Sequence, residues 1–270
     1  MDATNIFRLC RLRAWLALGS ERFPVTLSNK SGRDITPEKR PFDFGDVGLQ
    51  PVCTRWGFSR GHPIDRYYIE DFLARHRTDI RGHVIEIGDN TYTRQFGGTE
   101  VSRSDVLDIE PRSPLVTIVA DLTDAPKVPS NTFDCVIITQ VLVLIQDVAK
   151  ALATLCRILK PGGVALITVP GISQISSSSA EAQDWSWSFY PKTLRWLLLQ
   201  HDFDEEKLLV GGAGNLKTTV GFLLGLAQED LLASDFAVKD ERYPLVVTAR
   251  AVKKFPYAGV RAQGKGVSVQ

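Results

Sequence analysis

Cysteine, histidine and net charge are all scarce in this chain of 270 residues. The four cysteines, Cys10, Cys53, Cys135 and Cys156, lie far apart and form no C-x-x-C pair. That spacing favours neither a zinc site nor a disulfide framework, so we expect a reducing compartment. The four histidines form no H-E-x-x-H cluster, and the sequence therefore predicts no metal site. A formal net charge of +1 provides no field for nucleic acid or an acidic membrane.

Long apolar runs are also missing, since no stretch approaches the ~20 residues that a transmembrane helix needs. Arg11 and Arg13 interrupt the apolar N-terminus, which excludes the unbroken apolar core of a signal peptide. This N-terminus is instead typical of an amphipathic helix, which we expect to pack on its own protein in preference to a membrane surface. We therefore predict a cytoplasmic protein without membrane or nucleic-acid partners.

Residues 84–98 organise the rest of the chain. The apolar run Val84–Ile87 contains one acid, Glu86, and is followed by Gly88 and small polar residues. This order predicts a buried parallel strand that turns sharply into a helix. Ligands of open α/β sheets bind at the carboxyl ends of such strands, where glycine lets the backbone approach closely. The G-x-G-x-x-G fingerprint of a dinucleotide site is missing, because Asn90 occupies a position that needs glycine, and a nucleoside ligand without phosphates fits better.

Strands and helices alternate along the chain, which predicts an α/β fold with a doubly wound, mostly parallel sheet. We expect strands at residues 84–87, 100–109, 115–120, 133–139, 164–169, 207–211 and 243–252, and helices at 64–75, 144–158, 193–200 and 216–233. Residues 1–55 are rich in loops and predict an N-terminal arm or lid, followed by one domain over 56–253. The tail at 254–270 is expected to fray and to be dispensable.

Three acids, Glu86, Asp105 and Asp121, lie at or near the ends of three successive predicted strands. Because the carboxyl ends of parallel strands face one crevice, we expect their carboxylates to converge on one ligand. Asp105 would accept two ribose hydroxyls, and Asp121 an adenine amino group beside the backbone of Leu122. Any one of these acids taken singly could be an ordinary solvated residue, so the prediction depends on their order and spacing.

Residues 56–253 resemble a class I S-adenosylmethionine (SAM)-dependent methyltransferase. The resemblance rests on Glu86-Ile87-Gly88, Asp105, Ala120-Asp121-Leu122, Phe133–Ile137 and Leu159–Gly163. The chain is similar in particular to a bacterial group with three further motifs, found here at Trp56–Glu70, Glu86–Thr93 and Pro170–Ser176. Members of that group often occur with glycosyltransferases, which implies a glycan-related acceptor only loosely. Two departures are Trp187, where the group has an arginine, and a long predicted helix between the last two strands.

The resemblance implies a Rossmann-like, seven-stranded sheet and SAM as the cofactor. The implied cofactor-binding residues are Glu86, Ile87, Gly88, Asp89, Asn90, Asp105, Val106, Asp121, Leu122, Thr139 and Gln140. His62 and Tyr67 are candidate general bases, although a base is needed only where the acceptor must lose a proton.

The acceptor is expected between the loop at 56–68 and the segment at 172–190. Tyr68, Trp185, Trp187 and Tyr190 are its candidate contacts, because their ring faces suit an aromatic or sugar ring. The alternative is that these aromatic side chains pack against the edge of the sheet.

The leading interpretation is transfer of a methyl group from SAM to an oxygen, nitrogen or carbon atom of a small molecule. The acceptor would be glycan-related or an aromatic natural product. A methyltransferase-like binding or scaffold protein without turnover is the alternative. A nicotinamide-dependent oxidoreductase is disfavoured by the missing glycines. The sequence leaves the oligomeric state open.

Overall fold

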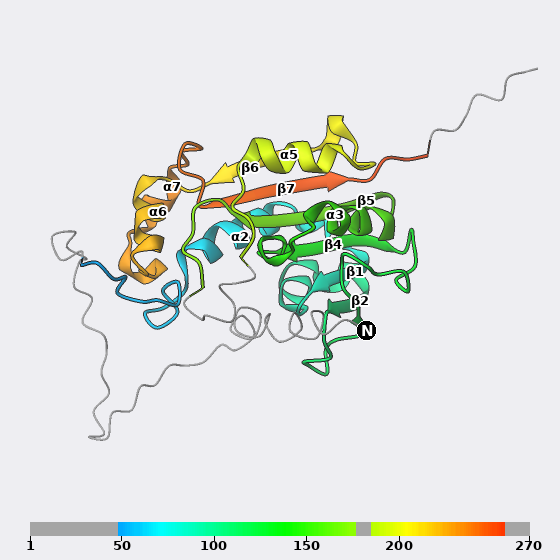
Figure 1. Cartoon of the computed structure of the whole chain (residues 1–270), viewed down its shortest axis with the longest axis horizontal. Coiled ribbons are helices and arrows are strands. Elements are labelled where there is room, and N and C mark those ends of the chain that lie inside the picture. The colour runs from blue at the N-terminus through cyan, green and yellow to red at the C-terminus, as the bar shows by residue number, and fades with distance from the viewer. Residues whose placement is uncertain (1–47, 177–184, 257–270) are drawn as a thin grey trace, which may run out of the picture.

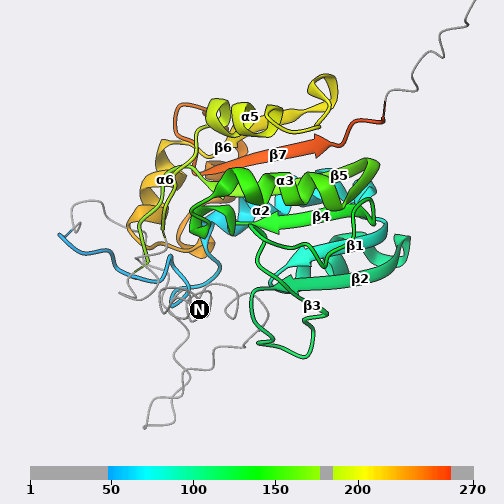
Figure 2. The same ribbon diagram turned by 45° about the vertical axis from the view of Figure 1, so that its right-hand side comes forward.

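A computed structural model describes residues 48–176 and 185–256 of the chain. Its strands are β1 (Gly82–Ile87), β2 (Val101–Asp108), β3 (Ile118–Val119), β4 (Phe133–Thr139), β5 (Leu159–Pro170), β6 (Leu209–Ala213) and β7 (Val246–Val252). They form one seven-stranded sheet in the order β3-β2-β1-β4-β5-β7-β6, visible in Figures 1 and 2. β7 runs antiparallel to both of its neighbours, and the other pairings are parallel. The predicted seven-stranded, mostly parallel α/β sheet is confirmed.

Helices cover both faces of this sheet, as the doubly wound pattern predicts. They are α2 (Ile64–Arg75), α3 (Val148–Ile158), α5 (Pro191–Leu199), α6 (Leu216–Leu223) and α7 (Ala233–Ala237). Short turns of other helix types are η2 (Arg77–Asp79), η3 (Thr93–Gly97), η4 (Gly98–Glu100), η5 (Leu142–Leu144), η6 (Glu205–Lys207) and η7 (Gln228–Asp230). α3 and α5 pack in the core on one face, and α2, α6 and α7 pack in the core on the other (Figures 1 and 2).

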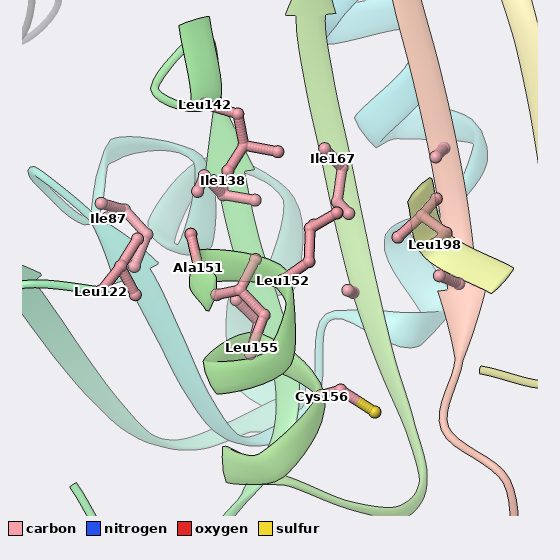
Figure 3. Close-up of a cluster of buried hydrophobic side chains, with 14 of the residues drawn as sticks. Ile87, Leu122, Ile138, Leu142, Ala151, Leu152, Leu155, Cys156, Ile167 and Leu198 are labelled. Atoms are coloured by element: carbon pink, nitrogen blue, oxygen red, sulfur yellow. The ribbon is translucent and has the colours of Figure 1, made fainter. Parts of the chain in front are cut away.

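The apolar run of β4 explains why the sheet is buried on both sides. Val136 and Ile138 face the core under α3, whereas Cys135 and Ile137 face the core under α2. Figure 3 shows Ala151, Leu152 and Leu155 of α3 packed over the strands in the first of these cores. Successive strand residues point to opposite faces, so a continuous apolar run is what a strand covered twice requires.

α3 begins later than the apolar periodicity predicts. The side chain of Asp147 accepts a hydrogen bond from the amide of Lys150 and caps the helix, which therefore starts at Val148. Residues 142–144, at the edge of the expected helix, belong to the separate turn η5. β3 is also shorter than expected, with two residues in place of six at 115–120.

The long helix predicted at 216–233 is wrong. α6 ends at Leu223, because Gly225 adopts a φ of +75° that ends the helix. A Cβ atom at Gly225 would lie 2.1 Å from the carbonyl oxygen of Cys53, so the chain needs glycine at this crossing. The segment between β6 and β7 consequently consists of α6, η7 and α7 in place of one long helix.

The N-terminal amphipathic segment and the glycine-rich tail at 257–270 lie outside the described residues, as do residues 177–184 of the serine-rich stretch. No helix within 48–176 and 185–256 is both long and apolar enough to cross a membrane. The same two ranges contain no group of three or more His, Cys, Asp or Glu side chains that could hold a metal ion. Cys53, Cys135 and Cys156 are buried free thiols.

Candidate functional site

The turn after β1 is organised by two carboxylates. Glu86 accepts hydrogen bonds from the amides of Tyr92 and Thr93, at 3.2 and 2.7 Å, and from the Thr93 hydroxyl at 2.7 Å. Asp89 accepts the amide of Thr91 at 2.8 Å. The first amides of the following helical turn are therefore occupied by side-chain carboxyl groups. This arrangement offers no cradle for phosphate, which agrees with the prediction of a nucleoside ligand without phosphates.

Glu86 is nearly inaccessible to solvent, and this changes its acidity. Burial, reinforced by the charge of Asp89, raises the pKa of Glu86 to about 8, although the hydrogen bonds from Thr93 and Tyr92 lower it. A cationic group placed beside this carboxyl would favour its ionised form. Both oxygens of Glu86 already accept hydrogen bonds from Tyr92 and Thr93, so a cationic ligand at the end of β1 would act on this carboxyl through its charge.

The loop that follows β1 contains buried polar atoms without a partner in the described part of the chain. Gly88 has a φ of +96°, and its amide donates to the carbonyl of Leu107 on β2 at 2.9 Å. Two buried oxygens of this loop, Oδ1 of Asn90 and Oγ1 of Thr91, have no hydrogen-bond partner among the described residues. Leaving such atoms unpaired costs about 1–3 kcal/mol each. A polar ligand with amino and hydroxyl donors, such as SAM, fits this loop chemically.

Asp105 does not lie where the sequence analysis expected it. It lies three residues before the end of β2, and its carboxylate contacts Nε2 of His83 at 2.6 Å, Oγ1 of Thr117 at 2.8 Å and Nε of Arg103 at 3.1 Å. Burial alone would raise the pKa of Asp105, but these hydrogen bonds outweigh burial and lower the pKa. Its expected position at the carboxyl edge is wrong, and its oxygens are already committed to protein partners.

Asp108 occupies the position that was expected of Asp105. It is the last residue of β2, adjacent to Leu107, whose carbonyl receives the Gly88 amide. Its side chain is 4% exposed, and burial raises its pKa despite the nearby Arg112. The signal was present in the sequence, because Asp108 stands at the end of the strand predicted over 100–109.

Other predicted cofactor residues divide between the edge and the core. Asp121 follows β3 with an exposed side chain whose Oδ1 accepts from the amide and hydroxyl of Thr123, at 2.7 and 2.8 Å. Thr139 ends β4, and the amide of Gln140 donates to Thr168 on β5 at 2.7 Å. These residues lie at the carboxyl edge beside Gly88 and Asp108.

The remaining three predicted cofactor residues are apolar and buried. Ile87 is the last residue of β1, and Leu122 packs in the core under α3. Val106 lies inside β2, two residues before the edge, with its amide donated to Oγ1 of Thr117 at 3.0 Å. Val106 therefore does not lie at the edge where the cofactor was expected, and Asp108 occupies that position instead.

A pocket lies at the same edge of the sheet, beyond β4 and β5. Its lining residues come from five parts of the chain: Trp56, Asp65, Gln140, Pro170, Ser173, Trp185, Phe222 and Leu245. We call this the tryptophan pocket, because Trp56 and Trp185 stack with ring centroids 6.0 Å apart and planes 14° from parallel. Nε2 of Gln174 also donates to the carbonyl of Thr54 at 2.7 Å. The loop before α2 and the segment after β5 therefore meet, as the sequence analysis expected of the acceptor site.

Backbone strain is concentrated in the tryptophan pocket. Three non-glycine residues of the described chain have positive φ, namely Trp56 at +53°, Asn131 at +54° and Gln140 at +58°. Asparagine tolerates this conformation, whereas tryptophan and glutamine adopt it rarely. Both of the unusual residues line the pocket. Strain of this kind collects at binding and catalytic sites, which supports a functional role for the pocket.

The structure separates the predicted acceptor contacts. Trp185 lines the tryptophan pocket, but Tyr68 is fully buried, and its hydroxyl donates to Oγ1 of Thr218 at 3.0 Å. The predicted substrate contact of Tyr68 is wrong, because it is a packing residue between α2 and α6. Trp187 stacks on the buried Phe189, and Tyr190 is 64% exposed at the start of α5.

The two candidate bases lie elsewhere as well. Nδ1 of His62 pairs with Oε1 of Glu229 at 2.7 Å, and its side chain is 78% exposed. Tyr67 packs against Phe236 of α7, with ring centroids 4.4 Å apart. Neither residue lines the tryptophan pocket. A general base at either position is therefore not supported by this arrangement.

The sheet order, the antiparallel β7 and the acidic carboxyl edge together define the class I methyltransferase fold. A model of the methyltransferase domain family matches residues 50–206, which is more than half of the chain. The chain belongs to this family. The class predicted from the sequence, an SAM-dependent methyltransferase with SAM as its cofactor, is confirmed.

Individual relatives are more distant. A stretch of 39 residues is 54% identical to the ubiquinone/menaquinone biosynthesis C-methyltransferase UbiE of Francisella philomiragia, and it spans 14% of this chain and 16% of that protein. An SAM-dependent methyltransferase from Archaeoglobus fulgidus has a TM-score of 0.49 and 14% identity, with 70% of this chain and 94% of that chain covered. The N-methyltransferase NodS from Bradyrhizobium japonicum has a TM-score of 0.45 and 15% identity, covering 72% and 89%.

Proposed function

We propose that this protein transfers the methyl group of SAM to a small molecule bound in the tryptophan pocket. The observation that carries this proposal is the position of Gln140, which lies at the cofactor edge directly after β4 and also lines the pocket. A ligand held by the carboxyl edge and a second ligand in the pocket would therefore be neighbours. Methyl transfer requires that adjacency, because it depends on the alignment of two reacting groups.

The cofactor is held by groups that accept hydrogen bonds. The amino group of SAM is assigned to Glu86 and Asn90, its ribose hydroxyls to Asp108, and its adenine amino group to Asp121. Carboxylates accept strongly and donate nothing, which matches a ligand rich in amino and hydroxyl donors. When bound, SAM supplies an electrophilic methyl group on a sulfonium.

The protein's contribution at the acceptor side is orientation and the exclusion of water. The rings of Trp56 and Trp185 form flat apolar walls, and Phe222 and Leu245 extend the apolar surface. The cavity itself is small, about 10 Å³, so the ring of an aromatic natural product or of a glycan-related compound would enter only when these walls move apart. The loose association of similar sequences with glycosyltransferases favours the second of these. In this site the catalytic advantage comes from holding the acceptor in line, with water kept out.

The test combines binding with turnover. Calorimetry with SAM should give a micromolar dissociation constant, and labelled SAM with a fractionated cell extract should yield a labelled small molecule. The Trp185→Ala variant should bind SAM normally but lose methyl transfer, because only the pocket is altered. If the wild-type chain binds SAM and labels nothing in any fraction, the scaffold interpretation is correct. If it binds no SAM, the proposed function fails.

A further inference from the structure

Asp65 is a buried carboxylate whose role the fold does not explain. It is the second residue of α2, it is 5% exposed, and it lines the tryptophan pocket. Its Oδ1 atom has no hydrogen-bond partner among the described residues. A buried carboxylate oxygen left in this state is costly, since burial of a charge is tolerated only with a partner.

The surroundings of Asp65 make this cost larger. Every other residue that lines the pocket is uncharged, and four of them, Trp56, Trp185, Phe222 and Leu245, have large apolar side chains. Burial raises the pKa of Asp65, and this effect outweighs the attraction of the adjacent Arg66. Hydrogen bonds from the backbone amides at the start of α2 also lower the pKa of Asp65. These bonds leave the Oδ1 atom without a partner.

A purely structural aspartate in the first turn of a helix would not need this environment. An acid there gains from the helix dipole while it remains in contact with water. Asp71, later on the same helix, shows the usual arrangement of a helix aspartate, because its partly exposed carboxylate pairs with Arg75 and Lys239 at 2.8 and 3.0 Å. Asp65 instead presents an unpaired oxygen to an aromatic pocket at the carboxyl edge of the sheet.

We propose that Asp65 binds a protonated amino group of the methyl acceptor, next to the stacked rings of Trp56 and Trp185. This inference rests on the proposed function, because the pocket is taken to be the acceptor site. An ammonium group both donates to Oδ1 and neutralises the buried charge, whereas a hydroxyl group does only the first. Tryptophan faces are also the strongest aromatic partners of cations, so the two indoles favour the same ligand. The acceptor is therefore an amine carried on a ring, such as an amino sugar or an aromatic amine.

The experiment compares 2-phenylethylamine with 2-phenylethanol, which have the same ring and chain but differ in the charged group. Binding is measured by ligand-observed NMR on the full chain saturated with S-adenosylhomocysteine, the demethylated cofactor. The wild type should bind the amine at least about 10-fold more tightly than the alcohol, the ratio expected of one charge-assisted hydrogen bond. Asp65→Asn should remove this preference and leave the affinity for S-adenosylhomocysteine unchanged. The matched control, Asp71→Asn, should retain the preference.

Stability provides a second measurement that a structural role would move. Asp65→Asn removes a buried carboxylate whose Oδ1 atom has no hydrogen-bond partner, so its melting temperature should not fall below that of the wild type. An amine that binds the wild type no better than the alcohol overturns the proposal, as does an Asp65→Asn variant that keeps the preference. A melting temperature lowered by several degrees assigns Asp65 to the fold and also overturns it. Failure of the wild type to bind S-adenosylhomocysteine would instead refute the proposed methyltransferase function itself.

Discussion

Two aspartates of β2 should respond in opposite ways to the same substitution. Asp105 and Asp108 are three residues apart on one strand, so their side chains leave on opposite faces of the sheet. Asp105 is enclosed by His83, Thr117 and Arg103, whereas Asp108 stands at the carboxyl edge beside the turn that follows Gly88. We predict that Asp105→Asn lowers stability without a direct effect on SAM, and that Asp108→Asn lowers SAM affinity without a loss of stability.

The magnitudes follow from the contacts. The carboxylate of Asp105 is 4% exposed, and breaking a buried charged pair costs about 3–5 kcal/mol. For a domain of this size, each kcal/mol lowers the melting temperature by about 2–4 °C, so Asp105→Asn should lower it by about 10 °C. At Asp108, two charge-assisted hydrogen bonds to ribose hydroxyls are worth about 1.5–3 kcal/mol each. The asparagine keeps one acceptor, and SAM affinity should therefore fall by about 10-fold or more.

Thermal denaturation and SAM calorimetry, both on the two variants and the wild type, separate these effects. The calorimetry is carried out well below the melting temperature of Asp105→Asn, so that affinity is measured on folded protein. The reasoning is refuted if Asp105→Asn binds SAM more weakly at an unchanged melting temperature while Asp108→Asn binds it normally. In that case the original assignment of the ribose to Asp105 would stand.

Three further predictions concern other parts of the site and fold. Trp187→Ala should lower the free energy of unfolding, measured with urea, by about 2 kcal/mol, because it removes the hydrogen bond to the Ile145 carbonyl and the stack on Phe189. Methyl transfer per folded molecule should be unchanged. Loss of transfer at full stability would show that Trp187 contacts the substrate. Because the pKa of Glu86 is raised from 4.5 to about 8, its carboxyl stabilises the fold below pH about 4.5, and this contribution is lost as the pH rises through about 8. Urea denaturation across that pH range should show that the free energy of unfolding of the wild type declines, and that of Glu86→Gln declines less. An equal dependence of stability on pH in the two proteins would contradict the assigned protonation of Glu86. Gly225→Ala should destabilise the protein by more than about 1 kcal/mol, because the new Cβ atom would meet the Cys53 carbonyl and because φ is positive at this residue. An unchanged melting temperature would argue against the close crossing of Gly225 and Cys53.

The sequence by itself determined the elements whose pattern is local. The apolar run of β4, the spacing of apolar residues in α2 and α3, and the glycine after β1 each specify a strand, helix or turn through neighbouring residues. The alternation of these elements was then enough to predict the mostly parallel sheet, because crossover connections are constrained in length and hand. Glu86, near the end of β1, and Asp121, after β3, were found in the same way, as residues at or near the ends of strands.

Only the tertiary structure decided which side chains are buried and what they meet. The choice between Asp105 and Asp108 depended on where β2 ends and on contacts with His83 and Thr117 from neighbouring segments. The end of α6 was decided by the crossing of Gly225 with Cys53, far away along the chain. Asp65 and Trp56 line the tryptophan pocket only because the segment after β5 folds back over the loop before α2. Periodicity records which face of an element is buried, but not the distant partner against which that face packs, and a binding site is made of such partners.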